Sequence, residues 1–279
     1  MALSETRWTG QGVERIKNKT FIYSGADKDR NYGVAIALSN QARRSWEEAG
    51  SVFHPVSERI LRIRIKTHFG HASIIAVYAP TNPTTPNDAT VSDAFYQQLQ
   101  TTLAAVPVRD MVIIMGDLNA RVGSDNAKWK SVMGCHSPDQ RNENGERLLD
   151  FCACNDLVIT NTCFPHKTIH KCTWFRNGDR TRPGRMIDYV LVNRRFRTSI
   201  LDTRTFRKTH VESDHELVVS TVRFKIKAKR MQNTGLRKRQ TCGLPMGSKI
   251  IFRTTHTHTH THTHTHTHTR THMCMHSEA

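Results

Sequence analysis

The C-terminal part of this chain has a composition that limits where a folded domain can end. From Thr255 to Thr269 the sequence alternates Thr and His, and from Lys225 to Arg239 it holds seven Lys or Arg residues and no acidic residue. Neither segment has the density of apolar residues that a hydrophobic core needs. We therefore predict a folded domain over residues 1–228 and a basic, disordered tail with a Thr-His repeat over residues 229–279.

The Thr-His repeat has two interpretations, and the sequence leaves both open. An AC dinucleotide repeat in the coding sequence would produce it without any function in the protein. Alternatively, its imidazoles form a tract that binds nickel or copper, or that changes its charge with pH.

Positive charge exceeds negative charge in the predicted domain as well as in the tail. The whole chain of 279 residues has 41 Lys and Arg residues against 24 acidic residues, and residues 1–228 alone hold 33 basic and 23 acidic residues. This excess predicts an anionic partner, and we expect nucleic acid rather than a membrane surface. The sequence contains no run of about 18 apolar residues, so it predicts no membrane span.

Signals for secretion are absent from the sequence. The first ten residues have no basic-then-apolar pattern, and seven cysteines without a CxxC pair fit reduced thiols better than disulfides or a zinc site. We expect an intracellular protein, nuclear rather than cytoplasmic, with Arg237-Lys238-Arg239 as a candidate import signal.

Several segments alternate apolar and polar residues, which is typical of half-buried strands. In Ile60–Lys66, for example, three apolar side chains alternate with three charged ones. We predict strands over Ile60–Lys66, Ser73–Tyr78, Asp110–Met115, Leu157–Asn161, Lys171–Phe175, Met186–Val192 and Leu217–Phe224. We predict helices from Ser92 to about Ala105 and over Asn144–Asn155. Many strands with few helices indicate an α/β fold, a four-layered α/β sandwich of two packed mixed β-sheets flanked by helices.

Two groups of polar residues follow apolar strands and are candidates for chemistry. Asp117 and Asn119, two residues apart after a buried strand, can point the same way, and they suit a hard cation or a phosphate with its attacking water. The same residue types are common in ordinary turns. His215 is suited to proton transfer near neutral pH, and Asp188, within an apolar strand, is a better partner for it than the adjacent Asp214.

Six phrases with these residues occur in a specific order: SETRWTGQG, VYAPT, MGDLNARVG, NENGERLLDFCACNDLVITNT, MIDYVLV and SDHELVV. Over residues 3–227 the chain therefore resembles the endonuclease/exonuclease/phosphatase superfamily, which includes apurinic/apyrimidinic endonuclease and deoxyribonuclease I. It is still more similar to the endonuclease domains of non-LTR (LINE, RTE-clade) retrotransposons.

The resemblance implies roles for the matching residues. Glu5 would bind the divalent cation, magnesium or alternatively manganese, and Asp214 would lie near it. Tyr78 would contact the scissile phosphate of DNA. Magnesium suits a site of few carboxylates and water.

The resemblance also implies the residues that handle the attacking water. Asp117 would position or deprotonate it, and Asn119 would help to hold the water and the phosphate. His215, held by Asp188, would act as general base or stabilise the developing negative charge. Phosphodiester hydrolysis needs both functions, and the sequence leaves the assignment of the base open.

A Gly- and Pro-rich hairpin between two predicted strands carries four arginines that can reach phosphates or enter a minor groove. In the LINE-like endonucleases the corresponding hairpin contacts DNA, although a solvated turn is the alternative. The candidate DNA-binding residues are Arg176, Arg180, Arg182 and Arg185.

The chain departs from the family at its start. Family members begin with a strand that ends in a Trp-Asn pair, whose Asn contributes to the metal site, whereas this sequence starts at the next element. We therefore expect the first strand to be missing, and catalysis to be weak or absent.

The predicted function is magnesium-dependent endonucleolytic hydrolysis of DNA, of LINE retrotransposon descent. The alternatives are a non-catalytic module that binds nucleic acid or protein, and a superfamily phosphatase that acts on inositol lipids or small phosphates. The sequence indicates no particular protein partner.

Overall fold

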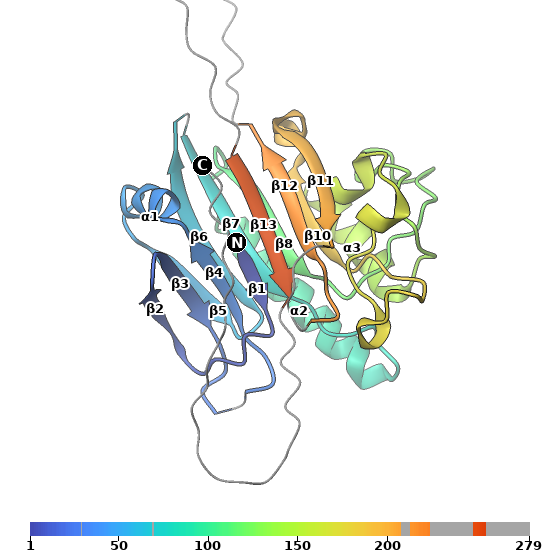
Figure 1. The fold of residues 1–279 in the computed structure, drawn as a ribbon, viewed down its shortest axis with the longest axis horizontal. Coiled ribbons are helices and arrows are strands. Elements are labelled where there is room, and N and C mark those ends of the chain that lie inside the picture. The colour runs from blue at the N-terminus through green and yellow to red at the C-terminus, as the bar shows by residue number, and fades with distance from the viewer. Residues whose placement is uncertain (29, 69, 208–212, 224–247, 255–279) are drawn as a thin grey trace, which may run out of the picture.

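Two β-sheets packed face to face form the centre of the molecule (Figure 1). The computed structural model describes residues 1–28, 30–68, 70–207, 213–223 and 248–254. The strands of one sheet are β1 (Ala2–Ser4), β2 (Gln11–Ile16), β3 (Lys19–Ser24), β4 (Val34–Leu38), β11 (Ile200–Phe206), β12 (Leu217–Val222) and β13 (Ser248–Thr254). The strands of the other are β5 (Phe53–Ser57), β6 (Ile60–Thr67), β7 (Gly70–Tyr78), β8 (Met111–Asp117), β9 (Leu157–Ile159) and β10 (Asp188–Asn193).

Both sheets are mixed, because each contains one parallel pair among antiparallel ones. Within the described ranges, the seven-stranded sheet has the order β11-β12-β13-β1-β4-β3-β2, and β1 and β13 are parallel. The six-stranded sheet has the order β5-β6-β7-β8-β10-β9, and β7 and β8 are parallel.

Two long helices pack against the outer face of the six-stranded sheet. They are α2 (Pro86–Ala104) and α3 (Glu143–Cys154), while the shorter α1 (Asn40–Glu47) lies at one end of the two sheets (Figure 1). Short 3-10 turns are η1 (Thr160–Cys163), η2 (Thr168–His170), η3 (Arg176–Gly178) and η4 (Arg194–Ser199). No helix in the described part of the chain is long and apolar enough to cross a membrane.

The two largest clusters of buried apolar side chains lie in separate layers. Ile36 of β4, Ile63 of β6 and Ile113 of β8 belong to the core between the two sheets. Ile114 of β8 and Leu99 of α2 belong to the core between the six-stranded sheet and the helices. Since β8 buries consecutive residues on opposite faces, it is covered on both sides, as its continuous apolar run predicts. The predicted fold class, two packed mixed sheets with helices outside, is confirmed.

Helix α2 begins earlier than the sequence analysis predicts. The N-cap is Thr85, not Ser92, because Thr85 and Asp88 form a reciprocal capping box and Pro86 occupies the first turn. Ser92 is a buried residue within the helix. The prediction of a strand over Lys171–Phe175 is also wrong: Trp174 forms isolated bridges with Arg185 and His215 there.

Strand β13 falls in the segment that the sequence analysis assigns to the tail. It lies between β12 and β1, antiparallel to β12 and parallel to β1, and so joins β11–β12 to the other four strands of its sheet. The Thr-His repeat at 255–269 and the basic run at 225–239 lie outside the described residues. The domain boundary at 228 and the disorder of the tail therefore stay predictions. Residues 248–254, which the sequence analysis assigns to the tail, pair with the sheet instead.

We predict that β13 is needed for a stable sheet. A chain that ends at Thr254 should keep the melting temperature of the full chain, whereas a chain that ends at Gly247 should melt at least about 5 °C lower, because it loses the backbone hydrogen bonds on both sides of β13. Circular dichroism during heating measures both. Equal melting temperatures for the two truncated chains would show that the sheet does not need β13.

Candidate active site

Three predicted site residues lie in one row at the end of the six-stranded sheet. Tyr78 ends β7, Asp117 ends β8 and Asp188 begins β10. The strand register pairs Tyr78 with Asp117 in the parallel direction and Asp117 with Asp188 in the antiparallel direction. All three residues are buried, so the sheet itself brings a phenol and two carboxyl groups together in a region with little water.

Asp117 is placed by a close contact between strands and a turn. A Cβ at Gly116 would lie 1.9 Å from the carbonyl oxygen of Val77, so only glycine allows β8 to approach β7 at this point. Asn119 then adopts a left-handed conformation with φ 45°, and its backbone N–H donates to Asp117 Oδ1 at 2.9 Å. The segment is a turn, and this turn orients Asp117.

The side chain of Asn119 closes the same turn. Its Nδ2 donates to the carbonyl of Ala79 at 2.9 Å. Asn144, which is buried in α3, donates to the carbonyls of Pro80 and Asn119 at 3.0 and 3.1 Å. These amides tie the ends of β7 and β8 to the start of α3.

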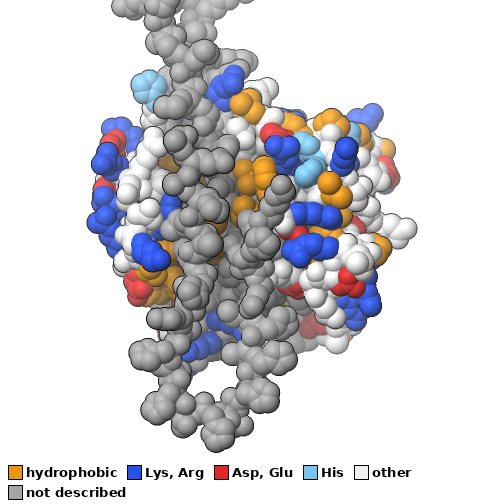
Figure 2. All heavy atoms as spheres, in the orientation of Figure 1, with side chains coloured by type: hydrophobic (Ala, Val, Ile, Leu, Met, Phe, Trp, Pro, Cys, Tyr) orange, Lys and Arg blue, Asp and Glu red, His pale blue; other side chains and the backbone are white. Residues whose placement is uncertain are grey.

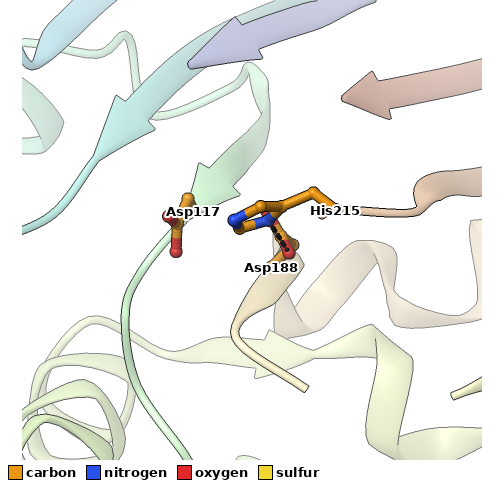
Figure 3. A group of neighbouring side chains, drawn as sticks. All are labelled: Asp117, Asp188 and His215. Atoms are coloured by element: carbon orange, nitrogen blue, oxygen red, sulfur yellow. Dashed lines mark hydrogen bonds and ion pairs between the residues drawn. The ribbon is translucent and has the colours of Figure 1, made fainter. Parts of the chain in front are cut away.

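His215 pairs with Asp188 and lies beside Asp117. His215 Nδ1 is 2.9 Å from Asp188 Oδ2, and both side chains are almost completely buried. Figure 3 shows the imidazole between the two carboxyl groups, with its second ring nitrogen turned toward Asp117. Among the described residues, these three form the group of acidic and imidazole side chains whose ligand atoms lie within 4.8 Å of one another.

The pKa values of His215 and Asp117 are both raised above their usual values. Burial acts to lower the pKa of His215, but the charge of Asp188, its hydrogen bond and the charges of Asp117 and Asp214 outweigh burial and raise the pKa to about 9. Burial, followed by the charge of Asp188, raises the pKa of Asp117 well above its usual value. At neutral pH His215 is therefore an imidazolium ion.

Glu5 reaches the row from the facing sheet. It follows β1 in a left-handed conformation, with φ 53°, and is buried. The hydroxyl of Tyr78 donates to the Glu5 carboxylate, and the pKa of Tyr78 is raised by burial and then by the charge of Glu5. Tyr78 therefore remains a hydrogen-bond donor at neutral pH.

The predicted metal residues Glu5 and Asp214 are not members of the tight group of three, but each acts on it. The charge of Glu5 contributes to the raised pKa of Asp117, and the charge of Asp214 contributes to that of His215. Asp214 Oδ2 accepts a hydrogen bond from Trp174 Nε1 at 2.7 Å.

The residues present fit a hard divalent cation. Glu5 and Asp117 are buried carboxyl groups. Burial and then the charge of Asp188 raise the pKa of Asp117, and the charge of Glu5 adds to them. Oxygen donors of this kind suit magnesium or manganese, and a cation beside them would relieve the repulsion.

The predicted DNA-binding arginines divide into two pairs. Arg180 Nε is 2.6 Å from Glu216 Oε1, and Arg185 Nη1 is 3.1 Å from Asp139 Oδ1; both carboxylates are buried. Arg182 has an exposed ion pair with Asp179, and Arg176 is exposed without an ion pair to any described residue. Arg180 and Arg185 therefore hold the hairpin to the site, while Arg176 and Arg182 face solvent.

The sequence analysis missed two residues that hold the main chain of Asp188. Thr173 Oγ1 accepts from the N–H groups of Ile187 and Asp188 at 3.0 and 3.1 Å. Asn161 donates to the carbonyl of Asp188 and accepts from the N–H of Val190. Both residues are buried and distant in sequence, so no local pattern could have indicated them.

Arg59 is a further residue that the sequence analysis missed. Its guanidinium carbon lies 4.0 Å from the ring centroid of Tyr32 and 5.1 Å from that of Tyr78, and its Nη1 donates to the carbonyl of Tyr78 at 3.2 Å. Within the described residues it has no ion pair with a carboxylate. It places a positive charge beside the phenol of the site.

A fold of two packed mixed sheets, with a His–Asp pair and a further carboxyl group at the strand ends, defines the class of protein to which the chain belongs. The sequence pattern of the Endonuclease/Exonuclease/phosphatase family matches residues 1–215, and the chain belongs to this family. It is similar to craniofacial development protein 2 of Bos taurus, with 31% identity over 227 residues, and to that of Tragulus javanicus, with 30% identity. The match covers 81% of this chain but 36% and 38% of these relatives, so the chain spans little more than a third of their length.

Solved structures agree with this assignment of the fold. The 3′ phosphatase NExo from Neisseria, bound to a product DNA hairpin, is 16% identical with a TM-score of 0.57, and the match covers 80% of this chain and 88% of that one. The endonuclease domain of TRAS1, a telomere-specific non-LTR retrotransposon, is 18% identical with a TM-score of 0.51, covering 75% of this chain and 80% of that one.

We predict that His215 titrates at a pH of about 9, which an NMR titration of its imidazole measures. Because this pKa lies above the value of about 6.5 in the unfolded chain, His215 contributes stability that is complete below pH 6.5 and is lost as the pH rises through 9. The contribution is about 3 kcal/mol, and urea unfolding at pH 6.5 and 9.5 should show a loss of this size. In an Asp188→Asn chain the pKa should fall and the loss should shrink; a pKa near 6.5 in the unsubstituted chain would contradict the prediction.

Proposed function

We propose that this chain hydrolyses phosphodiester bonds of DNA as a divalent-cation-dependent endonuclease of LINE retrotransposon descent. The observation that carries the proposal is the convergence of Asp117, Asp188 and His215 at one end of the central sheet, in a chain of the endonuclease/exonuclease/phosphatase family. These groups can orient a water molecule, accept its proton and neutralise charge on a phosphate.

The cation in this proposal is magnesium, with manganese as the alternative. Glu5, Asp117 and Asp214 would hold it. When bound, it supplies positive charge that neutralises the phosphate and favours the ionised form of Asp117.

The protonation states divide the work between Asp117 and His215. In the site without a cation, the pKa of about 9 keeps His215 protonated at neutral pH, which favours a role as a charge over a role as the base. It acts instead as a buried positive charge that stabilises the negative charge developing on the phosphate, with Asp188 holding its orientation. Asp117, whose ionised form the bound cation favours, then accepts the proton of the attacking water.

Tyr78 and Asn119 prepare the site for the phosphate. The raised pKa keeps the Tyr78 hydroxyl protonated, so its proton can be donated to a phosphate oxygen in place of Glu5 once Glu5 binds the cation. Asn119 holds the Asp117 turn through its backbone N–H and ties it to β7 through its amide.

The positive net charge of the chain and the similar solved structures support DNA as the substrate. The chain has a formal net charge of +17, and Figure 2 shows Lys and Arg side chains on the flank around α1 and on the flank around β11. The NExo structure contains a DNA hairpin, and the TRAS1 domain is an endonuclease of a non-LTR retrotransposon. A nuclear location accords with such a substrate.

We predict that the chain nicks supercoiled plasmid DNA with magnesium and that EDTA abolishes the activity. Asp117→Ala and His215→Ala should each lower the rate at least about 100-fold, because they remove proton transfer or charge stabilisation. His166→Ala is the matched control, since His166 also pairs with an aspartate, Asp202 at 2.6 Å, outside the tight group of three.

The outcomes of this assay separate the candidate functions. Binding to DNA that weakens with salt but never leads to nicking would support a non-catalytic module. Release of phosphate from small phosphate esters without nicking would support a phosphatase.

The hairpin arginines should have two kinds of effect. Arg176→Ala and Arg182→Ala should weaken DNA binding, because each removes an exposed phosphate contact. Each should also reduce the slope of the logarithm of the binding constant against the logarithm of the salt concentration by about one. Arg180→Ala should instead lower the free energy of unfolding, by roughly 1–3 kcal/mol, because it leaves the buried Glu216 unpaired. Fluorescence anisotropy over a salt series and urea unfolding measure the two effects; a loss of stability with Arg176→Ala would contradict the division.

A further inference from the structure

Residues 173–175 pair with the segment that carries His215. Phe175 N donates to the carbonyl of Asp214 at 2.9 Å, and Glu216 N donates to the carbonyl of Thr173 at 2.7 Å. Trp174 and His215 form the bridge between these two bonds. Trp174 is therefore the residue directly opposite His215 in a short antiparallel contact.

The side chain of Trp174 adds a bond to the neighbour of His215. Its indole Nε1 donates to Asp214 Oδ2 at 2.7 Å, a distance usual for a strong hydrogen bond to a charged acceptor. Indole N–H is a donor in every protonation state. The bond therefore holds one oxygen of Asp214 toward the indole at any working pH and restricts the rotation of the carboxylate.

A second tryptophan, Trp46, provides a comparison for the burial and the hydrogen-bond partner of Trp174. Trp46 of α1 is buried, and its Nε1 donates at 3.0 Å to a backbone carbonyl, that of Val52. Trp174 is less buried, and its N–H bonds to a charged side chain next to the group of Asp117, Asp188 and His215. Packing accounts for Trp46, whereas the contacts of Trp174 are directed at the site.

We propose that Trp174 is a positioning residue, whose indole N–H fixes the Asp214 carboxylate beside His215 in the orientation that a divalent cation requires. The inference deepens the proposed nuclease function and rests on it. Partners that orient a metal-binding carboxylate in this way typically change the affinity for the metal 10- to 100-fold.

The test measures manganese affinity of the full chain by electron paramagnetic resonance, with no DNA present. Trp174→Phe keeps an aromatic ring but removes the N–H, and it should weaken manganese binding at least about 10-fold. Trp46→Phe is the matched control, because it removes an indole hydrogen bond far from the site, and it should leave the affinity unchanged. Equal affinities for Trp174→Phe and the unsubstituted chain would overturn the proposal.

A double substitution tests whether Trp174 acts through Asp214. Asp214→Asn should lose affinity to a similar degree, and adding Trp174→Phe to it should cause no further loss. A further loss of the same size would overturn the proposal, because Trp174 would then act by another route. If Trp174→Phe does not fold, Asp214→Asn alone decides: full manganese affinity in that chain would overturn the proposal.

Nicking assays on the same chains distinguish this inference from the proposed function. An unsubstituted chain that binds manganese but does not nick DNA would remove the nuclease function and leave the positioning role to be judged by the affinities. An unsubstituted chain that binds no manganese would overturn the positioning role. In an active chain, Trp174→Phe should lower kcat with little change in KM. If Trp174 had a merely structural role, Trp174→Phe and Trp46→Phe should change kcat to the same degree.

Discussion

Two carboxyl groups that face each other across neighbouring strands are the constraint on which the rest of the site depends. The pairing of β8 with β10 places Asp117 directly opposite Asp188, and both are buried. Two buried negative charges at this distance repel each other strongly. The chain offsets the repulsion with the imidazolium of His215, which bonds to Asp188 and lies beside Asp117. The positive charge of His215, which comes from another segment, thus offsets the negative charges of Asp117 and Asp188.

That residue is delivered by the seven-stranded sheet. His215 precedes β12 and Glu5 follows β1, and β13 lies between these two strands. The site therefore needs both sheets in their packed arrangement, since one supplies the row of Tyr78, Asp117 and Asp188 and the other supplies Glu5 and His215. Strand β13 connects the two parts of the seven-stranded sheet, and it lies beyond the residues that match the family. The arrangement of the site therefore depends on residues outside the family match.

Local sequence patterns predicted much of the central sheet and the family. The alternation of apolar and charged residues predicted β6, and a continuous apolar run predicted β8. The close approach of Gly116 to β7 became visible only in the structure. The start of α2 was missed because Ser92 and Thr85 are both good caps, and the capping box with Asp88 decided between them. Strand β13 was missed because a short apolar segment inside a basic region carries little signal.

Contacts between distant residues account for what the sequence could not show. Four arginines on a hairpin look alike in sequence, but the buried carboxylates of Glu216 and Asp139 bind two of them, and nothing near Arg180 or Arg185 in the sequence indicates this. The hydrogen bond between Trp174 and Asp214 spans 40 positions of the sequence. The chemistry of the site thus depends on pairs that only the fold brings together.

The most direct test of the account is a crystal structure of the chain with manganese, in which the anomalous signal locates the cation. The account predicts a cation held by carboxylate oxygens of Glu5, Asp117 and Asp214, while His215 Nδ1 keeps its bond to Asp188. A cation bound to the ring nitrogens of His215, or a signal remote from Asp117, would contradict the central claim that His215 is a charged partner of Asp188 and not a metal ligand.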